Sequence, residues 1–277
     1  MMKKSLILLV IWLLSFGGVN AKEGRLYELE STQIVDIQDS QSGRAYELYI
    51  KLPQGYSEKE QKRYPVIYYT DAKWHLEILS SATEYIIEDV ILVGISWEKG
   101  LSNKKEHVSR FRDYTILKSK NPTRQTGDAK AHLAFIQNDV FRFVENLYRT
   151  VPENRSYFGY SLSGMFGAYI LLTQPDTFKN YILGSLTTLM DDSNIYEADT
   201  ITAVGINDKT NANVFISVGA KESPEMVNHA VGFVSWLNKK KQANLSAKLV
   251  VIEDEDHGSA FPMTAVRSIY WLADRYN

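Results

Sequence analysis

Ser161 stands in a short segment whose residue types suit nucleophilic chemistry. The segment "FGYSLSG" places Gly159 two residues before this serine and Gly164 three residues after it. Small residues let a strand and a helix meet at a sharp turn, on which a serine hydroxyl is lifted out and exposed. The pattern G-x-S-x-G is imperfect, because Ser163 stands where glycine is expected. We interpret Ser161 as a nucleophile, with a tight packing turn as the alternative.

A serine hydroxyl needs a general base at neutral pH, and His257 is the base that we predict. It directly follows the last expected strand, in "EDEDHGSAFP", where parallel sheets carry catalytic groups. His75 follows an earlier expected strand and stays open as a residue that lines the site. The three other histidines are expected to pack or to face solvent: His107, His132 and His229.

The base in turn needs a carboxylate that orients it, and Glu222 is the predicted acid. It follows the expected strand "NVFISVGA" and lies between Ser161 and His257 in the chain. The order serine, acid, histidine is typical of nucleophile-elbow hydrolases. Asp254 and Asp256 remain alternatives because they lie near His257 in the sequence.

Acyl transfer also requires hydrogen-bond donors for the developing oxyanion. One predicted donor is the backbone N–H of Leu162, directly after the nucleophile. The other is expected from the loop that follows "YPVIYYTDA", as the N–H of Lys73 or of Ala72. We also predict that the neighbouring side chains Trp74 and Tyr160 contact the substrate.

Strands and helices are expected to alternate along most of the chain. Two amphipathic strands come first, and later strands are continuous apolar runs typical of strands buried on both faces. The expected strands cover residues 28–39, 43–52, 64–72, 89–97, 155–160, 181–186, 213–220 and 247–256. The expected helices cover residues 76–87, 131–150, 164–174, 224–240 and 262–276. This order predicts an α/β fold, with a mostly parallel central sheet, helices on both faces and antiparallel N-terminal edge strands.

Residues 1–21 have the composition of an export signal. Two lysines precede an apolar run from Leu6 to Leu14, and small residues lead to Ala21. The run is short for the roughly 20 residues that span a bilayer, so we predict cleavage after Ala21 rather than a retained anchor. Residues 22–277 are expected to form one domain, periplasmic or secreted, without stable membrane insertion.

Charge and composition exclude several function classes. Removal of Lys3 and Lys4 with the signal lowers the formal net charge from −2 to −4, which argues against a nucleic-acid binder. The chain has no cysteine, so disulfides, a thiolate nucleophile and a thiolate metal site are excluded. We expect no metal and no organic cofactor. The oligomeric state is not predicted.

Residues 99–130 are polar and lack periodicity, and we predict that they form a lid or rim loop. Arg110 and Arg112 in this segment are predicted to bind substrate. The basic excess would attract an anionic substrate, with a solvated basic loop as the alternative. Further basic residues of the segment are Lys118, Lys120 and Arg124.

The assembled segments resemble the putative-esterase branch of the α/β-hydrolases, which includes ferric-enterobactin esterases, S-formylglutathione hydrolase and feruloyl esterases. The matching stretches are "YELYIKLPQGY", "YPVIYYTDA", "VGI", "RFRDYT", "LAFIQNDVFRFVENLYRT", "FGYSLSGMFGAYILLTQPDTFKNYI", "VFISVGAKE" and "DHGS". They cover roughly residues 40 to 275, and two of them look most like the siderophore-type, IroE/Fes-like hydrolases: "RFRDYT" and "LTQPDTFKNYI". The resemblance implies Ser161 as nucleophile, His257 as general base and acid, and Glu222 as acid.

Some positions depart from the family pattern. Ala72 stands where relatives have glycine after aspartate, Ser163 where glycine is common, and Ile116 where proline is usual. Some siderophore esterases of this type work with a Ser-His dyad, which leaves the acid open. The predicted function is an exported serine ester hydrolase acting on a small-molecule ester, of siderophore type or another small carboxylic ester. The alternatives are an acyltransferase, as in the mycolyltransferases on this scaffold, or a non-catalytic ligand-binding protein.

Overall fold

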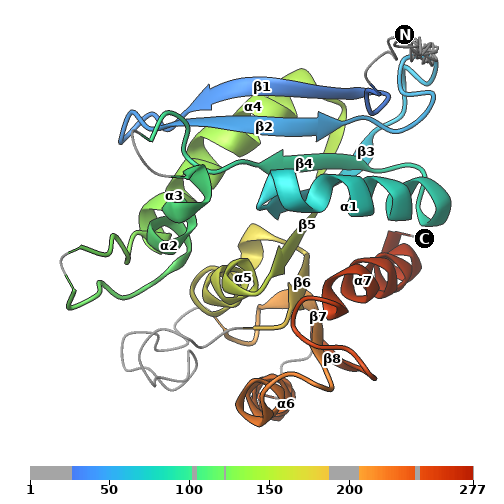
Figure 1. Cartoon of the computed structure of the whole chain (residues 1–277). Coiled ribbons are helices and arrows are strands. Elements are labelled where there is room, and N and C mark those ends of the chain that lie inside the picture. The colour runs from blue at the N-terminus through green and yellow to red at the C-terminus, as the bar shows by residue number, and fades with distance from the viewer. Residues whose placement is uncertain (1–26, 102–104, 122, 187–205, 241–243, 277) are drawn as a thin grey trace, which may run out of the picture.

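A single eight-stranded sheet forms the centre of the computed structural model (Figure 1). The structure describes residues 27–101, 105–121, 123–186, 206–240 and 244–276, so the predicted signal at residues 1–21 lies outside the described residues. The strand order is β1-β2-β4-β3-β5-β6-β7-β8. The strands are β1 (Thr32–Gln38), β2 (Ala45–Lys51), β3 (Tyr64–Thr70), β4 (Ile91–Ile95), β5 (Thr150–Tyr160), β6 (Asn180–Gly184), β7 (Asn211–Gly219) and β8 (Asn244–Ile252).

The direction of the strands follows the expected division. β1 and β2 are antiparallel to each other, and β2 is antiparallel to β4. From β4 to β8 every neighbouring pair is parallel. β2 alternates buried and more exposed residues and β1 is partly exposed along its length, whereas β4 and β6 are buried along their whole length. The predicted fold class is therefore confirmed.

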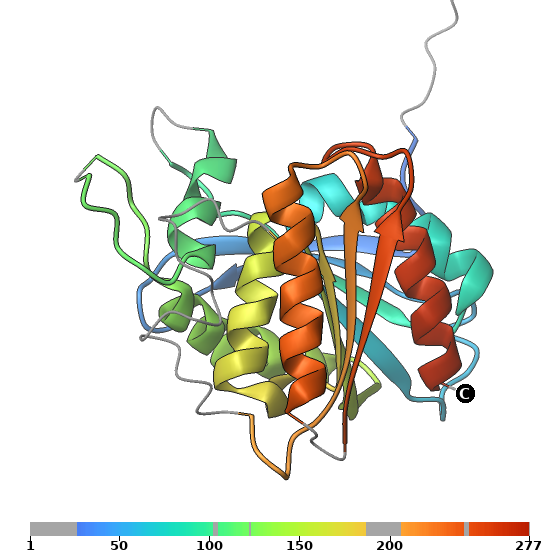
Figure 2. The same cartoon turned by 90° about the horizontal axis from the view of Figure 1, so that it is seen from below.

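Helices cover both faces of the sheet. They are α1 (Ala72–Ile86), α2 (Ser109–Tyr114), α3 (Ala129–Phe135), α4 (Phe141–Leu147), α5 (Leu162–Thr173), α6 (Pro224–Lys239) and α7 (Ala260–Tyr276). Short turns of helix complete the described part of the chain: η1 (Glu106–Val108), η2 (Ile136–Val140) and η3 (Pro175–Thr177). Figure 2 shows α5 and α6 on one side of the sheet and α7 on the other.

Two apolar clusters correspond to the two faces. The larger cluster joins one face of the sheet to α3, α4, α5 and α6, and the smaller one joins the other face to α1 and α7. α5 is buried over eleven consecutive residues, Leu162 to Leu172, so it is a core helix rather than an amphipathic surface helix. The rigid core thus fixes the start of α5, which is the predicted position of the nucleophile.

Two segments differ in detail from the expectations. Within residues 99–130, predicted to be a loop, the structure forms η1 and the short helix α2. The predicted helix over 131–150 begins earlier, at Ala129, ends at Leu147, and contains one turn of π-helix at η2. Among the described residues, no helix has both the length and the apolar character needed to cross a membrane.

Candidate active site

Ser161 lies between β5 and α5 in a backbone conformation that residues other than glycine rarely adopt. Its φ is 60° and its ψ is −121°, and it is the N-cap of α5. The turn is tight because a Cβ at Gly159 would lie 2.3 Å from the backbone oxygen of Ser163. The Ser161 N–H donates to the carbonyl of Gly184, 2.8 Å away, which ties the turn to β6. The strand-turn-helix expected from the sequence is therefore present, with a positive φ at the serine.

Ser163, the departure from the glycine pattern, has a clear structural role. Its hydroxyl accepts from the Tyr160 N–H at 2.9 Å and donates to the Tyr160 carbonyl at 2.9 Å. The side chain is completely buried. The backbone N–H and carbonyl of Tyr160 lie where β5 ends, so the Ser163 hydroxyl stabilises the turn that carries Ser161.

Three parallel strands bring the three predicted residues together. β5, β7 and β8 end at the same edge of the sheet, since all are parallel, and Ser161, Glu222 and His257 follow these three strands. The turn after β7 is held close to the loop after β8, because the Lys221 N–H donates to the carbonyl of Glu255 at 2.9 Å. A Cβ at Gly219 would lie 2.4 Å from that same carbonyl oxygen.

The side chains form a continuous hydrogen-bonded series. His257 Nε2 lies 2.9 Å from Ser161 Oγ, and His257 Nδ1 lies 2.8 Å from Glu222 Oε2. Nδ1 donates to the carboxylate, which leaves Nε2 free to accept the serine proton. The imidazole is 45% exposed whereas the Glu222 side chain is fully buried, so the base faces the surface and the acid lies behind it.

The Glu222 carboxylate is held in its charged form. Burial alone would raise its pKa, but hydrogen bonds from His257, Ser185 and the Gly219 N–H outweigh burial and lower the pKa below its usual value of 4.5. An ionised carboxylate next to Nδ1 stabilises the imidazolium that forms when His257 takes a proton. The arrangement can therefore support general base chemistry at neutral pH.

The alternative acids do not contact the imidazole through any hydrogen bond seen among the described residues. Asp254 is exposed and pairs with Lys221 at 3.3 Å. Asp256 accepts from the N–H groups of Gly258 and Ser259, each at 2.9 Å, and so shapes the turn that carries His257. Of the three acids considered, the structure brings Glu222 to the histidine.

The predicted oxyanion donors lie at the starts of two helices. Leu162 opens α5, and Ala72 and Lys73 open α1. N–H groups in the first turn of a helix have no partner within their own helix. β3 and β5 are neighbouring parallel strands, with Tyr69 opposite Phe158, so both helix starts lie at the same edge of the sheet. This placement is compatible with the predicted donors, whose role stays a prediction.

The two predicted substrate-binding arginines are engaged in ion pairs. Arg110 makes two hydrogen bonds to the buried carboxylate of Asp71, at 3.1 and 2.8 Å. Arg112 is buried and bonds to Glu98 and Asp113. The positive charge of both is balanced inside the protein, so we do not retain Arg112 as a substrate contact. The further basic residues that the sequence analysis named in this segment are exposed: Lys118, Lys120 and Arg124.

The other residues predicted to contact the substrate or line the site differ in their exposure. Trp74, on α1, is 50% exposed, and the Arg110 guanidinium lies 5.1 Å from its ring centre. Tyr160 is buried, and its hydroxyl donates to the His257 carbonyl at 2.7 Å, so it supports the histidine loop. His75 is also buried, with its ring 4.6 Å from that of Phe261, and it does not line an open surface.

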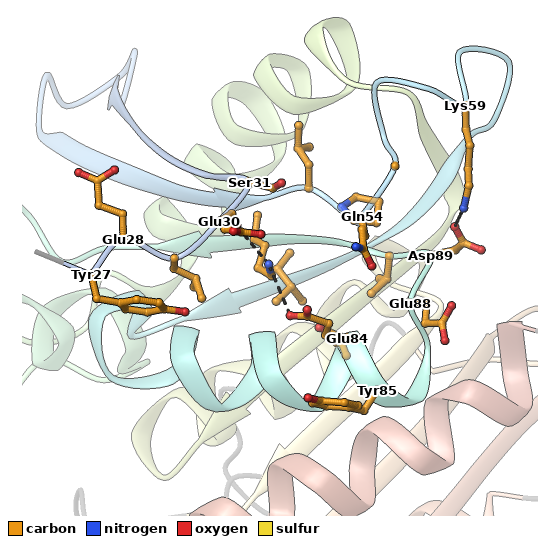
Figure 3. Close-up of a pocket in the computed structure, with 18 residues that line it drawn as sticks. Tyr27, Glu28, Glu30, Ser31, Gln54, Lys59, Glu84, Tyr85, Glu88 and Asp89 are labelled. Atoms are coloured by element: carbon orange, nitrogen blue, oxygen red, sulfur yellow. Dashed lines mark hydrogen bonds and ion pairs between the residues drawn. The ribbon is translucent and has the colours of Figure 1, made fainter. Parts of the chain in front are cut away.

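A cavity of about 970 Å³ lies away from these residues (Figure 3). It is bordered by Glu30 and Ser31 before β1, by Glu84 and Tyr85 of α1, and by Asp89 before β4. It therefore opens at the amino end of the parallel strands, the edge opposite Ser161. Within the described part of the chain, no group of three or more histidine, cysteine, aspartate or glutamate residues could hold a metal ion.

Sequence reasoning missed two side chains of the site. Ser185 donates to Glu222 Oε1 at 2.6 Å, and Asp71 anchors Arg110 beside the start of α1. Ser185 lies near the end of the run "YILGSL" and directly follows β6, at the same sheet edge as the other residues, and that position was the available signal. Asp71 directly follows β3, and its φ of 57° resembles that of Ser161.

The mostly parallel sheet with helices on both faces and antiparallel edge strands is the α/β-hydrolase fold, and solved structures support this class. The crystal structure of BES protein from Bacillus cereus is 22% identical, with a TM-score of 0.78, over 90% of this chain and 98% of that one. Siderophore hydrolase EstB from Aspergillus nidulans is 20% identical, with a TM-score of 0.74, over 89% of this chain and 96% of that one.

The sequence shows which family the chain belongs to. Residues 40–259 match the model of the family described as "Putative esterase", and the chain belongs to this family. It is also similar to ferri-bacillibactin esterase BesA of Bacillus subtilis (strain 168), at 24% identity over 90% of this chain and 92% of the relative. The resemblance inferred from the motifs is confirmed, and the chain is an ester hydrolase.

Proposed function

We propose that the protein hydrolyses carboxylic esters through an acyl-enzyme on Ser161. The supporting observation is the unbroken series from Ser161 Oγ to His257 Nε2, at 2.9 Å, and from His257 Nδ1 to Glu222 Oε2, at 2.8 Å. These distances lie within the range that proton transfer to a general base requires.

The proposed reaction has two halves. His257 Nε2 takes the hydroxyl proton of Ser161 as Oγ attacks the ester carbonyl, and the electron pair of the carbonyl double bond moves to its oxygen. The N–H groups of Leu162 and of Lys73 or Ala72 stabilise that oxyanion. The oxyanion then collapses, the bond to the alcohol breaks, and His257 returns the proton to the departing alcohol. Water, deprotonated by His257, releases the acid and restores Ser161.

We propose siderophore esters as the substrate class. The support is the similarity to a ferri-bacillibactin esterase, together with the exposed cations that remain on residues 115–130. These cations would attract an anionic ferric catecholate. A panel of alkyl esters, aryl esters and ferric catecholate esters tests this proposal. Turnover of the ferric catecholate no better than that of simple alkyl esters would contradict it.

We also propose that the protein is exported to the periplasm or secreted, on the basis of the composition of residues 1–21. Mass spectrometry of the protein from the extracytoplasmic fraction should find Lys22 as the first residue. An intact residue 1 in the mature protein would contradict cleavage.

The nucleophile is tested with a fluorophosphonate probe, which forms a covalent bond with an activated serine. The wild-type protein and a Ser40→Ala control, altered at an exposed serine of the β1–β2 turn, should both be labelled. Ser161→Ala should lose labelling and ester turnover together. Labelling that persists in Ser161→Ala would remove Ser161 from this role.

A further inference from the structure

Ser185 contacts the carboxylate of Glu222 from the side opposite His257. Its hydroxyl donates to Oε1 at 2.6 Å, and the Gly219 N–H donates to the same oxygen at 2.8 Å. Oε2 is thereby left to His257 Nδ1. Each carboxylate oxygen has its own partners, so the orientation of the group is fixed.

The backbone of Ser185 is itself held in an unusual conformation. The residue follows β6 with a φ of 43°, a region that residues other than glycine rarely occupy. It is completely buried, and its N–H donates to the Ser217 carbonyl on β7 at 2.8 Å. A residue held this way costs stability, so the surrounding sheet must enforce the conformation. The result is that the hydroxyl points at Glu222.

A second hydroxyl joins the arrangement from the strand that carries the nucleophile. Tyr160 donates to the His257 carbonyl at 2.7 Å, and its oxygen lies 2.8 Å from Ser185 Oγ. Burial raises the pKa of Tyr160, so the phenol stays protonated and remains a donor. Three contacts share two hydroxyl protons. The carbonyl of His257 can only accept, so Tyr160 donates to it. The hydroxyl proton of Ser185 is then shared between Glu222 Oε1 and the Tyr160 oxygen.

We propose that Ser185 and Tyr160 are positioning residues of the active site: Ser185 orients the acid, and Tyr160 fixes the loop that carries the base. This inference rests on the proposed serine hydrolase mechanism. The two hydroxyls contact each other, and together they hold both members of the Glu222–His257 hydrogen bond in place.

Two variants of Ser185 separate catalysis from folding. Ser185→Gly removes the hydroxyl and relieves the positive φ, because glycine adopts this region freely. Its melting temperature should equal or exceed that of wild type, while kcat should fall about tenfold, as expected for the loss of one hydrogen bond to a charged group. Ser185→Ala should lose as much activity without the gain in stability.

Ser217→Ala is the matched control. Ser217 is equally buried, lies on the neighbouring strand β7, and its hydroxyl contacts Thr264 at 2.8 Å rather than the site. This variant should keep wild-type kcat and KM. It thereby measures the effect of removing a buried serine hydroxyl that has no contact with Glu222.

The pH dependence of kcat/KM is a readout that a purely structural role would not move. A carboxylate that loses a donor has a higher pKa and attracts a shared proton more strongly. The Glu222–His257 pair should therefore take up a proton at higher pH. In Ser185→Gly and Ser185→Ala, the acid limb of the profile should shift to higher pH. The acid limb of Ser217→Ala should coincide with that of wild type.

Tyr160→Phe tests the second half of the pair. It should lower kcat by itself, and its combination with Ser185→Gly should lose less than the product of the single losses, because both hydroxyls support one interaction. A fully multiplicative loss would remove Tyr160 from the pair.

The inference and the proposed function fail differently. Ester turnover that persists in Ser161→Ala would end the proposed mechanism. A folded Ser185→Gly with wild-type kcat and an unmoved acid limb, alongside an inactive Ser161→Ala, would overturn only the role of Ser185.

Discussion

Ser161 has a backbone conformation whose strain should be measurable. A residue with a Cβ at φ 60° and ψ −121° lies outside the favoured regions, whereas glycine adopts such angles without penalty. We predict that Ser161→Gly is more stable than Ser161→Ala by about 1 to 2 kcal/mol. Urea denaturation of the two variants gives this difference directly.

A serine inside a helix provides the opposite control. Ser268 is buried in α7, and there glycine should be less stable than alanine by about 1 kcal/mol. If Ser161→Gly and Ser161→Ala unfold at the same urea concentration while the Ser268 variants differ, the turn at Ser161 stores no strain.

The acid is tested by a change that keeps its shape. Glu222→Gln removes the charge behind His257 and should lower kcat about 10³- to 10⁴-fold, with a much smaller effect on KM. Asp254→Asn is the matched control, since Asp254 is exposed and pairs with Lys221. Steady-state kinetics on one aryl ester compare the two. Near-normal kcat in Glu222→Gln would support a Ser-His dyad instead.

Residue types in their positions after strands were enough to predict which side chains converge. Ser161, Glu222 and His257 each follow a strand, and the structure brings them within hydrogen-bonding distance. Ser185 could not be predicted in the same way. A serine after a strand is common, and its contact with Glu222 depends on a positive φ that no sequence pattern specified.

At the scale of single elements, the start of α1 depends on a buried ion pair. Asp71 is fully buried and stands at the N-cap position of α1 with a φ of 57°. Its carboxylate accepts from Trp97 Nε1 at 2.7 Å as well as from Arg110. Asp71→Asn keeps the bond to Trp97 and tolerates the left-handed conformation, but it leaves the Arg110 guanidinium without its counter-charge.

We predict that Asp71→Asn lowers the free energy of unfolding by about 3 kcal/mol, because removing one charge of a buried ion pair leaves the other charge buried without a partner. Asp36→Asn is the control, as Asp36 is 81% exposed where it pairs with Lys99, and its loss should cost less than about 1 kcal/mol. Urea midpoints measure both. An equal loss of unfolding free energy in the two variants would show that the buried pair stabilises the protein no more than the exposed pair does.

The helix α2 shows why an element can be missed. It has six residues and no apolar repeat. One apolar ring, that of Tyr114, packs into the core, and the buried Arg112 is held by ion pairs. Sequence periodicity therefore predicted a basic loop at residues 99–130. The long helix before β5 was recognised because its apolar residues repeat at helical spacing, although the π turn η2 within it left no recognised signal.

At the scale of the whole molecule, alternation of strands and helices predicted a parallel sheet but not its order. β4 lies between β2 and β3, so the chain passes from β3 to β4 on one side and returns to β5 on the other. This reversal places the ends of β3 and β5 side by side, with the starts of α1 and α5 at one edge. Apolar runs carry no information about such an order, since every central strand is similarly buried.

The core also contains two buried histidines that make stability depend on pH. Burial lowers the pKa of His75 from 6.5 to about 4, with Asp71 opposing and Arg110 reinforcing the effect. Burial also lowers the pKa of His132, with Asp113 opposing and Arg112 reinforcing it. Neither ring nitrogen of His132 has a hydrogen-bond partner, and aromatic rings surround it: Tyr46, Tyr114, Phe135 and Phe166.

A histidine whose pKa is lower in the folded protein binds more protons when unfolded, so stability is lost as pH falls below the unfolded value. The contribution of His75 should decline between pH 6.5 and about 4, by about 3 kcal/mol in total. His132→Phe loses no hydrogen bond and should match wild type at pH 7, then exceed its stability increasingly as the pH is lowered. Urea midpoints at pH 7, 6, 5 and 4 measure the two curves, and parallel curves would show that His132 takes no part in the acid sensitivity of the core.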